Sequence, residues 1–153
     1  MDINSKAGFL KNNYVQALQE IDPATAPAWG KMNVHQMIEH MSYSFRQASG
    51  KDNYTILTPA ENLPRMQAFL MSEKEFKENT PNQLLPDVPP PPVHSSIAAS
   101  LNELQAEIND FFAVFDGAQE KTITNPFFGE LTYEMWVQLL HKHARHHLKQ
   151  FGA

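Results

Sequence analysis

The sequence predicts an all-α protein, a four-helix bundle with a long proline-rich crossover between its second and third helices. Three observations support this fold class. Four stretches repeat apolar residues every three or four positions, alternating strand patterns are weak, and prolines are dense in the middle of the chain. A length of 153 residues is typical of one domain, so we treat residues 1–153 as a single domain.

The first two helices are predicted over residues 5–21 and 34–48. Pro23 ends the first stretch, because the residue before a proline is disfavoured in a helix. In front of the second stretch, Asn33 is a suitable N-cap, and Gln36 three residues later completes a capping box.

The segment between the second and third helices, about residues 50–94, is predicted to be mostly irregular. Its densest proline run, LPDVPPPPV at 85–93, is incompatible with a helix or an inner strand and favours an extended, polyproline-like conformation. A short helix is predicted around Pro64–Ser72, because proline is well tolerated in the first turn of a helix.

The last two helices are predicted at about 96–115 and 133–150, with a serine in front of the former and Thr132 as the N-cap of the latter. Between them, EKTIT at 120–124 alternates only briefly and is a weak strand candidate. We expect the links to pair the first helix with the second and the third with the fourth.

Composition excludes several classes of function. The net charge of -5, with no basic run outside a histidine-rich stretch, argues against nucleic-acid binding. Apolar runs are too short to span a membrane. Since the chain has no cysteine, disulfides, thiolate ligands and cysteine nucleophiles are excluded. With no apolar signal segment at the start, a cytoplasmic location is expected.

Four of the seven histidines fall within residues 141–147, on the last predicted helix. At about 100° per residue, His147 lies about 40° from His143, on the same apolar stripe as Trp136. His141 falls at about 160° on this wheel and His146 at about -60°. The wheel therefore directs His143 and His147 inward and leaves the other two solvated or partly solvated.

Two inward imidazoles one turn apart suit a divalent metal ion, although a third ligand must then come from another helix. The second predicted helix offers His35 and His40, and its periodicity does not choose between them. The alternative is that His143 and His147 are hydrogen-bonded structural residues of the core. His94, beside the proline run, is interpreted as a plain loop residue.

The segments KMNVHQMIEHM and NPFFGELTYEMW…LLHKHARHHLKQFG resemble the DinB-like (YfiT-like) superfamily of four-helix metalloproteins. The resemblance selects His40 rather than His35 as the third ligand, beside His143 and His147. It also marks Gln150 as the residue that would orient a ligand imidazole. It implies an up-down-down-up bundle that holds a divalent ion, with nickel or zinc the expected metals.

The resemblance includes thiol S-transferases, and the first of two hypotheses is a metal-dependent enzyme in which the ion activates a water or a thiol. The expected reaction is transfer of a low-molecular-weight thiol such as bacillithiol, mycothiol or a glutathione-like thiol, or hydrolysis of a small molecule. The resemblance is compatible with a homodimer. Glu39, Tyr43 and His146 remain open as general bases. The competing hypothesis is a non-catalytic bundle that binds a ligand or partner, with structural histidines or a vestigial metal site.

Overall fold

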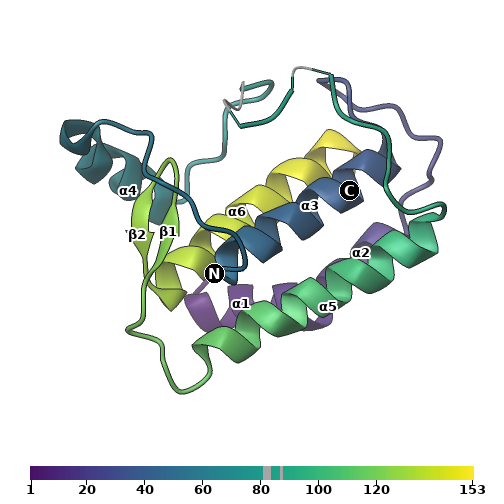
Figure 1. Cartoon of the computed structure of the whole chain (residues 1–153). Helices are drawn as coiled ribbons and strands as arrows, with labels where there is room; N and C mark the ends of the chain where they lie inside the picture. Colours follow the sequence, from purple (N-terminus) through teal and green to yellow (C-terminus); the bar gives the residue numbers. More distant parts are fainter. Residues whose placement is uncertain (81–83, 87) are drawn as a thin grey trace.

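Figure 1 shows a mainly helical chain with one small sheet. It is a computed structural model of the 153-residue chain and describes residues 1–80, 84–86 and 88–153. The elements are α1 (Ile3–Asn12), α2 (Tyr14–Gln19), α3 (Val34–Ala48), the 3-10 helix η1 (Ala60–Asn62), α4 (Leu63–Met71), α5 (Ile97–Phe115), β1 (Ile123–Asn125), β2 (Gly129–Leu131) and α6 (Tyr133–Gln150).

Helix α3 has the predicted limits, and the predicted capping box is confirmed. The Asn33 side chain accepts a hydrogen bond from the backbone N–H of Gln36 at 2.7 Å. In return, the Gln36 side chain accepts one from the backbone N–H of Asn33 at 2.9 Å. These bonds satisfy two backbone donors that the start of a helix otherwise leaves unpaired.

The prediction of one continuous helix over 5–21 is wrong. The chain forms α1 and α2, which are interrupted at Asn13, where φ is -125°, and α2 ends at Gln19. Asparagine is a weak helix former because its side chain competes for backbone hydrogen bonds, and Asn12 precedes Asn13 directly. Leu10 and Tyr14, on either side of the interruption, are both fully buried.

The other predicted helices are confirmed within a residue of their limits. Helix α5 follows Ser96, whose hydroxyl accepts from the backbone N–H of Ala99 at 3.1 Å, and α6 follows Thr132. Helix α4 is the predicted short helix of the middle segment. In the proline run 85–93, Asp87 lies outside the described residues, and the remaining residues form neither helix nor strand.

The weak strand candidate at 120–124 contributes to β1, which pairs antiparallel with β2. No strand was predicted at the position of β2. The turn between them is stabilised by the Asn125 side chain, which accepts from the backbone N–H groups of Phe127 at 2.8 Å and Phe128 at 3.0 Å. Gly129 follows with φ +85°, a conformation that residues with a side chain rarely adopt.

The predicted helix pairing is wrong. The most extensive helix–helix contacts join α3 to α5 and α1 to α6, and α3 also contacts α6. In the described part of the chain, α1 makes no comparable contact with α3, nor does α5 with α6. The connections over 20–33 and 116–132 are long, so each can join two helices that follow each other in sequence without packing extensively against each other.

A continuous apolar core lies between the helices. Its largest fully buried side chains are Trp136, Tyr14, Phe45, Phe111 and Phe115. At one end of the long helices, α4 lies beside the β1–β2 hairpin (Figure 1). Among the described residues, no helix combines the length and apolar character needed to cross a membrane.

Replacing Asn33 with alanine should lower the free energy of unfolding by about 1 kcal/mol, because the Gln36 N–H loses its acceptor. Urea unfolding followed by circular dichroism measures this loss. Asn13→Ala is the matched control, since Asn13 makes no side-chain capping bond. An equal loss in both variants would contradict the role assigned to the capping box.

Candidate metal centre

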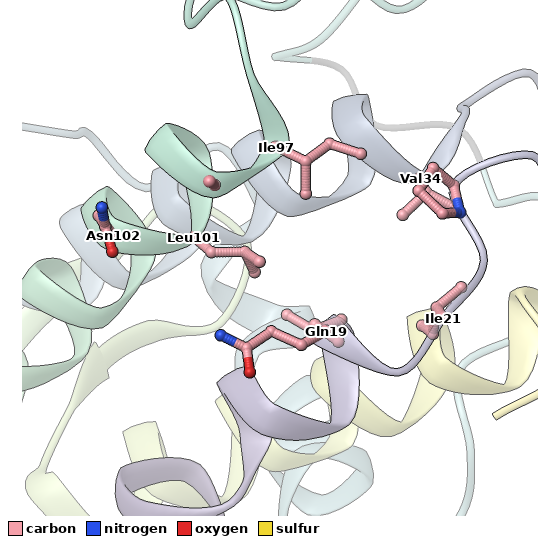
Figure 2. Close-up of a pocket in the computed structure, with 9 residues that line it drawn as sticks. Gln19, Ile21, Val34, Ile97, Leu101 and Asn102 are labelled. Carbon is pink, nitrogen blue, oxygen red and sulfur yellow. The ribbon is translucent and has the colours of Figure 1, made fainter.

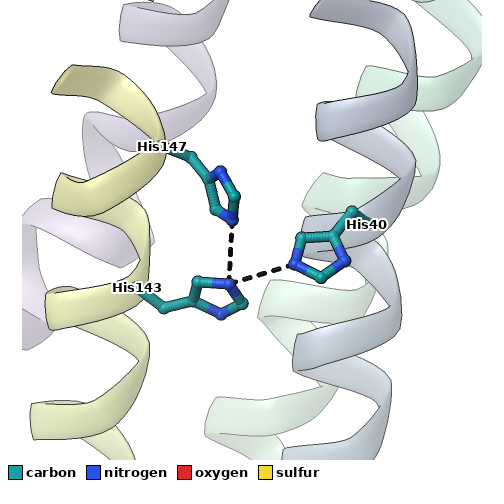
Figure 3. A group of neighbouring side chains, drawn as sticks. All are labelled: His40, His143 and His147. Atoms are coloured by element: carbon teal, nitrogen blue, oxygen red, sulfur yellow. Dashed lines mark hydrogen bonds between the residues drawn. The ribbon is translucent and has the colours of Figure 1, made fainter. Parts of the chain in front are cut away.

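Three histidines from two helices meet between α3 and α6. His40 lies near the middle of α3, while His143 and His147 lie one turn apart on α6. Figure 3 shows the three rings arranged in a triangle, with dashed lines from His143 to His40 and to His147. One nitrogen from each ring lies within 4.8 Å of the others, so the structure brings together the three residues that the sequence analysis selected.

The three rings approach one another through the same ring atom. The Nε2 atom of His143 is 3.0 Å from Nε2 of His40 and 2.9 Å from Nε2 of His147. Because His143 and His147 lie one turn apart on a single helix, both imidazoles lie on the same face of α6 and point toward α3 (Figure 3).

Gln150 fixes the proton on His147. The Gln150 side-chain amide donates from Nε2 to the backbone carbonyl of Trp29 at 2.8 Å. Its Oε1 is then the acceptor for Nδ1–H of His147, at 2.8 Å. Since a neutral imidazole carries one proton, Nε2 of His147 presents a lone pair to the other two rings.

Burial keeps all three imidazoles neutral at pH 7. It lowers the pKa of His40 to about 4, and the nearby His146 adds to the effect. Burial and then the neighbouring His40 lower the pKa of His147 to about 3, against the opposing effect of its bond to Gln150. Burial, with His147 and His40 close by, holds the pKa of His143 well below its usual value. Neutral imidazoles are the form that binds metal ions.

The cluster fits a divalent cation in both spacing and ligand type. Nitrogens bound tetrahedrally to zinc at about 2.0–2.1 Å lie about 3.3 Å apart. Two of the observed separations, 3.0 Å and 2.9 Å, are close to that value. Within the described residues, no carboxylate belongs to the group. A set of imidazoles alone favours ions such as zinc and nickel over magnesium or calcium.

Comparison with protein families places the chain. The family model of the DinB superfamily matches residues 12–151, a range that includes all three histidines. The chain belongs to the DinB superfamily. Comparison with curated proteins finds no match, and comparison with solved structures finds none either. The family resemblance stated from the sequence is therefore confirmed.

The remaining histidine of α3, His35, does not reach the cluster of this DinB protein. Its Nε2 lies 2.8 Å from the hydroxyl of Ser100 on α5, and that hydroxyl donates to the Glu39 carboxylate at 2.8 Å. His35 therefore belongs to a polar network between α3 and α5. His94, predicted as a plain loop residue, contacts the Glu103 carboxylate of α5 through Nε2.

The prediction that His141 is solvated is wrong. Its side chain is only 8% exposed, and its ring meets the ring of Phe9 edge-on with centroids 5.7 Å apart. The helical wheel placed His141 opposite the stripe that carries His143 and His147. That side of α6 is nevertheless covered by α1, so α6 is buried on two faces rather than one.

An aromatic rim, formed by Trp29, Phe76 and His146, lies beside the cluster. His146 is partly exposed, as predicted, and its ring centroid is 5.1 Å from Trp29 and 5.9 Å from Phe76. The Phe76 ring also meets His143 edge-on at 6.0 Å. Neither Phe76 nor Trp29 was assigned to the site from the sequence, because both lie in irregular segments without periodicity.

Two of the three general-base candidates have other partners. Both oxygens of Glu39 are engaged, by the backbone N–H groups of Val93 at 2.7 Å and His94 at 3.0 Å. The Tyr43 hydroxyl accepts from Tyr54 at 2.9 Å, and burial together with this contact raises the Tyr43 pKa. Of the three candidates, only His146 is shown in contact with the cluster, where its ring meets the ring of His147 at 5.1 Å.

The segment that carries Phe76 is anchored by the residue that precedes His143. Lys142 is buried, and its ammonium group donates to the backbone carbonyls of Ser72, at 2.9 Å, and Lys74. Gln138 donates to the same Ser72 carbonyl at 2.9 Å. These bonds hold residues 72–74 against α6, so Phe76, two residues further along the chain, lies beside the cluster.

Two surface hollows lie away from the three histidines. One, of about 310 Å³, is lined by apolar residues such as Ile21, Val34 and Leu101 between α2, α3 and α5 (Figure 2). The other, of about 730 Å³, lies between α1, α2 and the end of α6. Neither is lined by a histidine of the cluster, so chemistry rather than cavity size identifies the candidate site.

Replacing Lys142 with methionine should loosen residues 72–77, because two backbone carbonyls lose a charged donor. We expect trypsin to cleave after Lys74 or Lys77 roughly tenfold faster, as measured by mass spectrometry of timed digests.

Lys149→Met is the matched control for this experiment. Lys149 pairs with Glu75 in the same segment, but both side chains are largely exposed, and such pairs contribute little. Equal cleavage rates in Lys142→Met and the native chain would contradict the anchoring role.

Proposed function

We propose that this DinB protein binds one divalent metal ion through His40, His143 and His147, with zinc or nickel as the native metal. We further propose that it is an enzyme that uses the ion to activate a water or a low-molecular-weight thiol against a small molecule. The observation that carries the proposal is the convergence of three neutral imidazoles through Nε2 between α3 and α6.

Ligand number favours a catalytic site over a structural one. Structural zinc sites have four protein ligands, whereas catalytic sites have three and keep a position open for water or substrate. A metal ion held there would lower the pKa of a bound water or thiol and so supply a nucleophile near neutral pH. Because all three protein ligands are neutral, they would not reduce the charge of the ion.

The chain's own groups would orient the ligands and shape the approach. Gln150, held by the Trp29 carbonyl, keeps the His147 proton on Nδ1. Phe76 and Trp29 flank His146 with apolar surface, which restricts water and favours a substrate with an apolar part. His146 is the residue of this rim that can accept or release a proton.

The proposed bundle counts α1 with α2 as one helix, followed by α3, α5 and α6, in the up-down-down-up order of the family resemblance. The contacts of α3 with α5, α1 with α6 and α3 with α6 support this arrangement. In such a bundle, ligands from facing helices project into the interior, as His40 and His143 do here.

Protein purified without a histidine tag should contain about one zinc or nickel ion per chain, as determined by elemental analysis. His40→Ala and His143→Ala should lose the metal yet stay folded. Zinc added to the metal-free native chain at 100 times its Kd should raise the free energy of unfolding by about 2.7 kcal/mol.

His35→Ala is the matched control, because this histidine lies on α3 but contacts Ser100 rather than the cluster. It should keep the metal. A native chain that folds without metal and takes up neither zinc nor nickel at micromolar concentration would contradict the proposal. It would favour the non-catalytic alternative.

Enzymatic activity is tested separately from metal binding. Metal-loaded protein, incubated with glutathione, bacillithiol or mycothiol and a chromogenic aryl halide, should accelerate thioether formation at least about tenfold, which is about 1.4 kcal/mol of activation free energy. An activated ester tests hydrolysis in the same way. The acceleration should disappear in the metal-free chain and in His143→Ala. Metal binding without either activity would leave a binding protein.

A further inference from the structure

A serine of α3 contacts His143 from the side away from the other two ligands. The hydroxyl oxygen of Ser44 lies 3.3 Å from Nδ1 of His143. The same oxygen lies 3.2 Å from the backbone carbonyl oxygen of His40, one turn earlier on α3. Ser44 is buried at 7% exposure, so water does not easily replace either contact.

These two contacts determine where the His143 proton lies. A carbonyl oxygen only accepts, so the Ser44 hydroxyl hydrogen is donated to the carbonyl of His40, a common bond for a serine within a helix. The Ser44 oxygen then meets Nδ1 of His143 with a lone pair, and Nδ1 must be the donor. A neutral imidazole has one proton, so Nε2 of His143 is left with a lone pair.

We propose that Ser44 is a positioning residue of the metal site, which holds the His143 proton on Nδ1 and directs its Nε2 lone pair toward His40 and His147. Gln150 does the same for His147. The two ligands of α6 are thus oriented from two different helices, one by Ser44 of α3 and one from within α6. This inference rests on the proposed function, because it concerns ligands of the same ion.

The two anchors together explain why the cluster attracts a cation. With both protons on Nδ1, the Nε2 lone pairs of His143 and His147 face each other across 2.9 Å. His40 can donate one hydrogen bond to His143, but that leaves the lone pair of His147 without a donor from the cluster. A metal ion bound by all three nitrogens would remove this repulsion. The two Nδ1 anchors thus orient the lone pairs for a metal ion already in the metal-free chain.

The chain contains a matched control in Ser42, two residues earlier on α3. Ser42 is buried to the same degree, at 6% exposure, but its hydroxyl has no hydrogen-bond partner among the described residues. Ser42→Ala and Ser44→Ala therefore remove the same atom from the same helix, and only the latter removes a contact with His143.

Zinc affinity is the first measurement, by competition with a chromophoric chelator. Ser44→Ala should bind zinc about 10–100-fold more weakly than the native chain, as expected for loss of a partner that orients a ligand. Ser42→Ala should be unchanged, and Ser44→Thr, which keeps the hydroxyl, should retain most of the affinity. Equal zinc affinity in Ser44→Ala and the native chain would overturn the proposal.

The second measurement is the position of the His143 proton in the metal-free native chain, from nitrogen chemical shifts of ¹⁵N-labelled histidine. We expect it on Nδ1, and Ser44→Ala should show both tautomers. A proton on Nε2 in the native chain would overturn the proposal even if Ser44→Ala did not fold. A native chain that binds no zinc would contradict the proposed function, whereas the position of the His143 proton, read without metal, tests the orienting role of Ser44 separately.

Discussion

The structure depends on placing three neutral imidazoles, one buried and two partly buried, between α3 and α6. A buried polar group is unfavourable unless it is hydrogen-bonded, so each ring needs partners. Gln150 is the partner of Nδ1 of His147, and Ser44 is the partner of Nδ1 of His143. The Nε2 atoms of these two rings therefore face each other and Nε2 of His40. The surrounding polar residues therefore bind the Nδ1 atoms of His147 and His143. They leave the three Nε2 atoms without a partner outside the cluster.

This arrangement extends to the loop after α2. Ala28 donates its backbone N–H to the Gln150 carbonyl at 2.8 Å, and the Trp29 carbonyl accepts from the Gln150 side chain. Gly30 follows with φ +77°, and a Cβ there would lie 3.3 Å from the Gln150 amide nitrogen. Both the backbone conformation and the close approach favour glycine. The end of α6 and this loop are thus fixed together, and with them the orientation of His147.

Local signals in the sequence were sufficient for most helices and for the two histidines that share α6. The capping box at Asn33 lies within the residues that begin α3, and helix geometry alone puts His143 and His147 on one stripe. Long-range packing leaves no such signal. A helical wheel places His141 opposite that stripe but does not reveal that α1 covers it. Likewise, Ser44 reaches His143 only across the contact between α3 and α6.

The helices that carry the cluster also anchor two irregular segments of the chain. Glu39, next to His40, binds the backbone of residues 93–94, and Gln36, one turn earlier, donates to the Pro90 carbonyl at 3.1 Å. Lys142, next to His143, binds the backbone of residues 72–74. Adjacent residues on a helix point about 100° apart, so one turn supplies both a ring for the cluster and an anchor for an irregular segment. Because Phe76, which follows residues 72–74, also contacts His143, a shift of α6 would move a ring of the cluster and this anchored segment together.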